Sequence, residues 1–139
     1  MVRLLMFCCL LFTVNTAHAK RLAVLDFTSV KSEPELLQVM AEMVRNEAVN
    51  LLSASDIKVM DQANMLSILE DQGKDASCLT GECEIELGRN IGADFVVTGQ
   101  MTVLDGDWIL NLRLYETESG SRLKGLSIEA KSSKGLRQA

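Results

Sequence analysis

Residues 95–115 constrain the fold most, because their pattern is that of a β-hairpin. In "FVVTGQMTVL", residues 95–104, apolar and polar side chains largely alternate. "DGD", residues 105–107, is a turn signal, and "WILNLRLY", residues 108–115, repeats the alternation with Trp108, Leu110, Leu112 and Leu114 on one face. Alternation with a period of two on both sides of Asp-Gly predicts two antiparallel strands. A sheet with one apolar face is therefore expected in the last third of the chain.

The chain before this hairpin begins with a strand and a long helix. "RLAVLDF", residues 21–27, is a short apolar run typical of a buried strand. Ser32 with Glu35 forms a predicted capping box, and Pro34 falls in the first helical turn, where its missing N–H costs little. The following apolar residues recur at three- and four-residue spacing, which predicts one face of a helix: Leu37, Met40, Val44, Ala48 and Leu51.

The middle of the chain predicts one strand and two short helices. "IKVMD", residues 57–61, is interpreted as a strand, and Met65–Leu69 as a helix that Gly73 ends. A third helix begins near Cys83 and ends at Gly92. "LKGLSIEAK", residues 123–131, forms the last strand, and the residues after it resemble the start of a further helix. The expected fold is one α/β domain in the order β-α-β-α-α-β-β-β, with a mixed sheet packed by helices.

The first residues are typical of a secretory signal peptide. Arg3 precedes an apolar run of eleven residues, Leu4–Val14, and Ala17 and Ala19 have the spacing that a signal peptidase recognises. A membrane-spanning helix needs roughly 20 apolar residues, so a retained anchor is the weaker interpretation. We expect residues 1–19 to be a signal peptide cleaved after Ala19, and residues 20–139 to be a single periplasmic domain. Stable membrane insertion of that domain and lipidation are not expected.

Composition argues against several classes of protein. The only histidine, His18, lies in the predicted signal peptide, so the remaining chain has no imidazole for Ser-His or Cys-His catalysis. The formal net charge is −5, and no basic stripe is present, which disfavours binding to nucleic acid. The sequence contains no phosphate-binding glycine motif. We therefore expect no enzyme activity, no cofactor and no metal.

Cys78 and Cys83 are the two cysteines outside the predicted signal peptide. A thioredoxin-type redox site would have two residues between its cysteines, whereas four separate these two, and a zinc site would need four ligands. An exported protein with an even number of cysteines favours a disulfide, which would stabilise so short a loop by about 2 kcal/mol. Because Cys83, Leu87 and Ile91 have helical spacing, Cys83 is predicted to point inward.

Clustered acids are the alternative candidates for chemistry. Glu82, Glu84 and Glu86 begin the predicted third helix, and Glu70 and Asp71 are adjacent. Side chains two apart on a helix do not converge, so solvated acids near the positive end of the helix are favoured over a cation site. The "DGD" segment lacks the further oxygen ligands of a calcium loop. The methionines are interpreted as adaptable core residues.

Four phrases carry a resemblance to a known family: "LAVLDFT", "NMLSILEDQG", "ELGRNIGADFVVTGQMT" and "LRLYETESG". They resemble the envelope family of the curli-secretion protein CsgG, the TolB amino-terminal domain and LpoB, over nearly all of residues 21–130. The resemblance implies an anticodon-binding-like α/β domain that docks to other envelope components. Members often have an Arg where this chain has Asp61 and Gln62, and the membrane-inserting hairpins of the CsgG channel have no counterpart here.

The leading hypothesis is a non-catalytic periplasmic or cell-envelope interaction module, with association with the outer membrane left open. The alternative is an accessory or subunit of a curli-type outer-membrane secretion assembly, which would self-associate. Both hypotheses require an envelope protein partner that the sequence does not name. A homo-oligomer is left open by the sequence.

Overall fold

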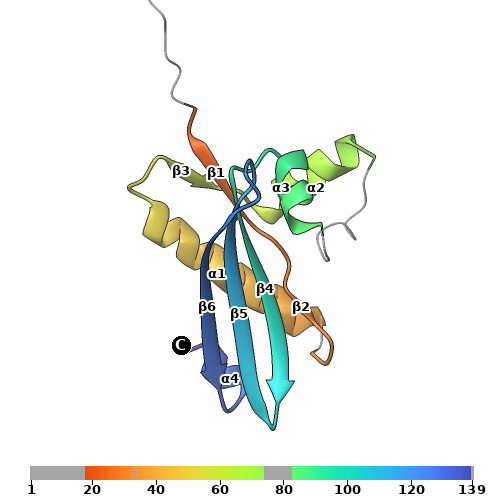
Figure 1. Ribbon diagram of the computed structural model, residues 1–139, viewed down its shortest axis with the longest axis vertical. Helices are drawn as coiled ribbons and strands as arrows, with labels where there is room; N and C mark the ends of the chain where they lie inside the picture. The colour runs from red at the N-terminus through yellow and green to blue at the C-terminus, as the bar shows by residue number, and fades with distance from the viewer. Residues whose placement is uncertain (1–17, 33, 74–82, 139) are drawn as a thin grey trace, which may run out of the picture.

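A mixed β-sheet forms the centre of the protein in the computed structural model, which describes residues 18–32, 34–73 and 83–138 (Figure 1). Within these residues the sheet has six strands. The strands are β1 Lys20–Val24, β2 Thr28–Ser29, β3 Ile57–Val59, β4 Phe95–Leu104, β5 Asp107–Glu116 and β6 Arg122–Ala130. The helices are α1 Pro34–Leu52, α2 Gln62–Asp71, α3 Glu84–Asn90 and α4 Ser133–Leu136.

The sheet joins a parallel part to an antiparallel part. The strand order is β3-β1-β4-β5-β6, and the short β2 pairs separately with β4. β1 lies between β3 and β4 and is parallel to both, with Lys20 opposite Ile57 and Leu22 opposite Phe95. β4, β5 and β6 run antiparallel to their neighbours. β1, the first strand of the described residues, is therefore an interior strand of the sheet, next to the edge strand β3.

The predicted hairpin is confirmed as β4 and β5. The two strands pair along their whole length, and Leu104 lies opposite Asp107. The connecting residues Asp105 and Gly106 have φ angles of 51° and 88°. Positive φ at both central positions matches the right-handed twist of the strands, which explains why Asp-Gly occurs here. Directly after the turn, the Asp107 carboxylate accepts a hydrogen bond from the Lys131 ammonium at 2.8 Å.

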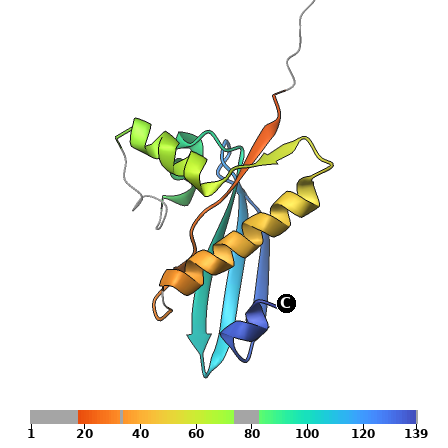
Figure 2. The same ribbon diagram turned by 180° about the vertical axis from the view of Figure 1, so that it is seen from behind.

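Helices cover the two faces of the sheet unequally. α1 lies across one face, whereas α2 and α3 cover only the end of the other face near β1 and β3 (Figures 1 and 2). The buried residues form two clusters, one on each face. The cluster under α1 contains Val24, Phe27, Leu37, Met40, Ala41, Met101, Leu110 and Leu136. The cluster under α2 and α3 contains Ala23, Leu25, Met60, Met65, Leu69, Leu87, Ile91, Ala93 and Val96.

The remaining part of β4, β5 and β6 has one uncovered face, and its side chains are mainly polar. Arg113 donates to the Gln100 side-chain oxygen at 3.0 Å. Ser127 donates to the Asn111 side-chain oxygen at 2.8 Å. These cross-strand pairs satisfy polar groups on a solvated face. Within the described residues, no helix is long and apolar enough to span a membrane.

The expected α/β fold is confirmed, but two local predictions are wrong. The first strand ends at Val24 and does not continue to residue 27, because the chain leaves the sheet at Asp26 and rejoins it where Thr28 pairs with Gln100. Among the described residues, no backbone N–H of α1 donates to the Ser32 hydroxyl, so the predicted capping box is not formed there. Ser32 lies before Pro34, and its hydroxyl donates to the Met101 sulfur at 3.4 Å.

Candidate interaction site at Asp26

The connection from β1 to β2 lines a pocket on the protein surface. The pocket has a volume of about 390 Å³ and lies between this connection and the first turns of α1. Its floor includes the buried ring of Phe27 and the buried Leu37. The side chain of Asp26 contributes a carboxylate at one side. Among the described residues, the pocket is lined by Asp26, Phe27, Thr28, Ser29, Pro34, Leu37 and Gln38.

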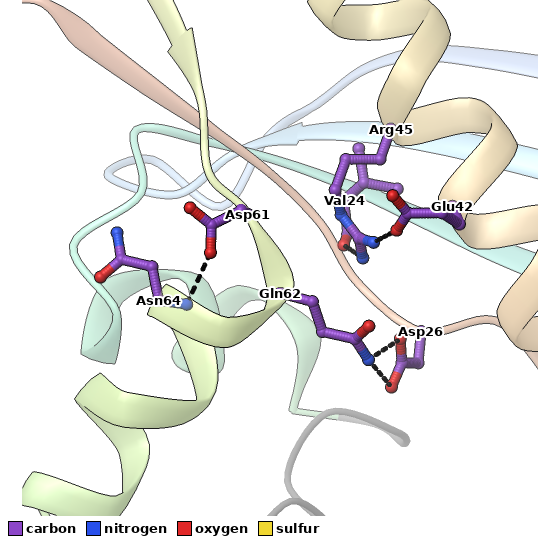
Figure 3. Close-up of polar contacts among 7 residues, drawn as sticks. All are labelled: Val24, Asp26, Glu42, Arg45, Asp61, Gln62 and Asn64. Carbon is purple, nitrogen blue, oxygen red and sulfur yellow. Dashed lines mark hydrogen bonds and ion pairs between the residues drawn. The ribbon is translucent and has the colours of Figure 1, made fainter.

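Asp26 is partly buried and has only a weakly bound partner among the described residues. The Gln62 amide nitrogen donates to its two carboxylate oxygens at 3.3 and 3.5 Å (Figure 3). Both distances are longer than those of typical N–H···O hydrogen bonds, which reach about 3.2 Å. Burial raises the pKa of Asp26 above its ordinary value, and the positive charge of Arg45 partly opposes this effect.

Arg45 is a buried charge on the inner side of α1. Its residue exposure is 4%, and its Nη2 donates to the Val24 carbonyl at 2.9 Å. β3 accompanies β1 only as far as Leu22, so this carbonyl lies beyond the ladder that pairs β1 with β3. Arg45 also forms an ion pair with Glu42, one helical turn away (Figure 3). The guanidinium therefore stabilises the end of β1, next to Asp26.

The start of α2 positions Gln62. Asp61 is the N-cap of this helix, and its carboxylate accepts from the Asn64 backbone N–H at 2.7 Å (Figure 3). Such a cap stabilises a helix start by about 1 kcal/mol. Gln62 is the first residue of α2 and directs its amide toward Asp26. The β1–β2 connection thus carries a carboxylate that accepts from an amide on α2 and feels the charge of a guanidinium on α1.

The chemistry of the pocket suits binding better than bond cleavage. A desolvated carboxylate beside an apolar floor can accept hydrogen bonds from a cationic side chain whose aliphatic stem packs on Phe27 and Leu37. A general base acts on a substrate proton within hydrogen-bonding reach. The groups near Asp26 in the structure, Gln62 and Arg45, donate hydrogen bonds. In the described residues, no three His, Cys, Asp or Glu side chains converge to hold a metal ion.

The structure describes only one cysteine of the predicted disulfide, because Cys78 lies outside the described residues. Cys83 is the N-cap of α3 and is exposed. The prediction that Cys83 points inward is therefore wrong. The N-cap residue precedes the first helical turn, so its side chain does not continue the stripe formed by Leu87 and Ile91, which are both buried. The Cys78–Cys83 pairing stays a prediction.

The acids singled out in the sequence that the structure describes lie on α2 and α3. Glu70 and Asp71 are exposed at the end of α2, as expected. Glu84 and Glu86 occupy the first turn of α3, whereas Glu82 lies outside the described residues. Glu84 is partly buried, contrary to the expectation of a solvated acid. Burial raises its pKa, while the Thr98 hydroxyl and the charge of Arg113 act in the opposite direction.

Sequence reasoning missed Asp26, Arg45 and Gln62. Two of them carry a signal, because each is a charged residue within an apolar pattern. Asp26 interrupts the run "LAVLDF", and Arg45 falls four residues after Ala41 on the buried side of the helix. A buried charge needs partners, so both positions predict a polar contact. Gln62 carries no such signal, because it is separated from Asp26 by 36 residues.

Comparison with solved structures shows the same fold in other proteins. The LpoB C-terminal domain from Salmonella enterica matches with a TM-score of 0.64 and 15% identity, over 86% of this chain and 87% of that one. Lipoprotein GNA1162 from Neisseria meningitidis matches with a TM-score of 0.59 and 15% identity, over 81% and 80%. TolB from Acinetobacter baumannii matches with a TM-score of 0.54 and 13% identity, over 86% and 25%.

No protein-family model matches the chain, and no curated protein matches it. At these identities the likeness establishes the fold and leaves the function to be argued from the site. The fold expected from the resemblance to LpoB and the TolB amino-terminal domain is thereby confirmed. The likeness to CsgG stays a prediction.

Proposed function

We propose that this protein is a non-catalytic interaction module of the cell envelope, and that it docks to another envelope protein through the Asp26 pocket. The observation that carries the proposal is the partly buried Asp26 carboxylate beside an apolar floor. A carboxylate in that position costs stability unless a partner compensates it, so its presence is explained by binding. The partner group best suited to it is a lysine or arginine side chain.

The arrangement around Asp26 supports recognition of one side chain. Arg45 is fixed by its contacts with Val24 and Glu42, and the Gln62 amide donates to Asp26, so both groups lie beside the carboxylate before a partner arrives. A preorganised acceptor loses less entropy on binding than a mobile one. The pocket volume of about 390 Å³ is within the range of specific binding pockets, and it is large enough for one long side chain. Gln38, exposed on α1, lies at its rim.

The compartment forms part of the proposal. We infer that residues 1–19 direct export and that residues 20–139 act in the periplasm. The described fold is consistent with this division, because β1 begins at Lys20, directly after the expected cleavage site. The fold likeness to the C-terminal domain of LpoB and to a neisserial lipoprotein supports an envelope role.

The test is photo-cross-linking in intact cells. A photoreactive amino acid at Gln38 should capture one envelope protein. The matched control is the same amino acid at Asn50, which is exposed at the other end of α1 and outside the pocket. The substitution Asp26→Asn in the protein labelled at position 38 should reduce the captured amount, because it removes the charge that a cationic side chain would meet.

Identical products from positions 38 and 50, or capture unaffected by Asp26→Asn, would contradict docking at this pocket. The non-catalytic assignment has a separate test. Purified protein should leave peptidoglycan and peptide substrates intact, and turnover of either one would overturn that assignment.

A further inference from the structure

The edge strand β6 is long, exposed and uncharged at its centre. In the part of the chain that the structure describes, β6 pairs with β5 on one side and with no strand on the other. The exposed fractions of Leu123 and Leu126 are 51% and 57%. Edge strands of soluble proteins are usually short, bulged or charged, since an open edge invites another strand. The opposite edge follows that rule, because β3 has three residues and includes Lys58.

Residues 125–128, at the centre of β6, read Gly-Leu-Ser-Ile, without a charge or a proline. Charged residues flank them, with Arg122 and Lys124 on one side and Glu129 on the other. The strand thus carries positive charge before its uncharged centre and negative charge after it. Two copies of such a strand are complementary when they run antiparallel.

Arg122 and Glu129 lie on the same face of the sheet. Arg122 is opposite Tyr115, and Glu129 is opposite Ile109 in the unbroken strand β5. The irregular pairing between Leu114 and Tyr115 brings Arg122 to this face, which is the one that α1 does not cover. The Arg122 guanidinium lies over Gly125, since a Cβ built on Gly125 would overlap it. The glycine thus leaves room for the arginine to extend along the strand.

We propose that two copies of this protein associate through β6, in antiparallel register about a two-fold axis at Leu126. In this register, Leu126 of one copy lies opposite Leu126 of its partner, and Gly125 lies opposite Ser127. The Arg122 guanidinium over Gly125 then comes within diagonal reach of the partner's Glu129. Symmetry repeats the contact, so two intermolecular ion pairs lie on the face that α1 does not cover, and the Leu126 pair lies on the other face.

The ion pairs explain why the association is intermolecular. Arg122 and Glu129 are seven residues apart on one strand, which is about 23 Å, so they do not meet within one chain. The interface is one strand pair with few side chains, and it belongs to the small and transient class. We therefore expect a dimer that forms at micromolar concentrations or above. Self-association goes beyond the docking function, because β6 is separate from the Asp26 pocket.

The experiment measures oligomeric state by sedimentation velocity over a range of concentrations, with protein purified after expression of the complete sequence. The unchanged protein should show a reversible monomer–dimer equilibrium. Arg122→Glu and Glu129→Arg should each weaken dimerisation at least tenfold, because each replaces two ion pairs by two like-charge contacts. Circular dichroism of each variant checks that it remains folded.

Mixing the two single variants provides a control that a merely structural effect cannot imitate. An equimolar mixture of Arg122→Glu and Glu129→Arg should restore dimers, since each ion pair is again formed between opposite charges. The double variant Arg122→Glu/Glu129→Arg should also dimerise. Monomers at all concentrations of unchanged protein, or no recovery in the mixture, would overturn the proposal. Neither result would affect cross-linking at Gln38, so the two proposals fail separately.

Discussion

At the scale of single residues, Asp26 illustrates a conflict between stability and binding. Burial raises its pKa in the folded protein, so its ionised form is less favourable there than in the unfolded chain. The resulting loss of stability is complete above the raised pKa and disappears as the pH falls below the ordinary value of 3.8. Residues that weaken a fold in this way are found where function requires them.

We predict that Asp26→Asn raises the free energy of unfolding at pH 7. The asparagine removes the desolvated charge and can still accept from the Gln62 amide. The gain should shrink as the pH is lowered and vanish near pH 3, where Asp26 itself is protonated. Urea unfolding at several pH values measures this difference.

The control for this measurement is Asp56→Asn, because Asp56 is an exposed acid before β3. It removes the same formal charge without relieving a buried one. A gain of equal size from Asp56→Asn would indicate that net charge, and not the site of Asp26, governs the effect. Loss of stability in Asp26→Asn at pH 7 would mean that attraction to Arg45 outweighs burial.

At the scale of secondary-structure elements, the β1–β2 connection packs against a position of β4 that has no side chain. Gly99 is buried, and a Cβ built on it would overlap the ring of Phe27. The Phe27 ring therefore occupies the space where a side chain of β4 would otherwise be. Because Phe27 is also the floor of the pocket, this contact links the sheet to the candidate site.

We predict that Gly99→Ala lowers the free energy of unfolding by about 1–3 kcal/mol, the usual cost of overpacking a core. Phe27 is 2% exposed and cannot swing away from the new methyl group. In the background Phe27→Leu, which supplies space, the cost of Gly99→Ala should be smaller. A double-mutant cycle by chemical denaturation isolates this coupling. Equal costs in both backgrounds would exclude Phe27 as the cause.

The elements also show how far the sequence could predict the fold. β4 was expected at residues 95–104 and is found there, because alternation and Asp-Gly are local signals. β2 has only two residues, Thr28 and Ser29. Its partners, Gln100 and Met101, are far away in the sequence. The same limit applies to the site, since Gln62 meets Asp26 only when α2 packs beside β1. Local chemistry predicted the elements, but contacts between distant segments define the pocket.

At the scale of the whole molecule, the position of Lys20 connects the fold to processing. β1 begins at Lys20, whose ammonium lies 5.1 Å from the centre of the Phe95 ring. We predict that the protein isolated from the envelope begins at Lys20. Amino-terminal sequencing measures this directly. A start at Met1 in membrane fractions would mean that the apolar run is retained.

The interior place of β1, between β3 and β4, has a consequence for the order in which the protein folds. Among the described strands β1 is synthesised first, yet its residue Leu22 pairs with Phe95 of β4, which is 73 residues later in the chain. β5 pairs with β4 and β6, which are close to it in sequence. The pairing of β1 with β4 joins distant parts of the chain, and such contacts form more slowly. A nascent chain therefore stays without its completed sheet until synthesis is almost finished. For the proposed export of this protein, the delay favours a route that carries unfolded polypeptide, since the last pairing can then form after transport.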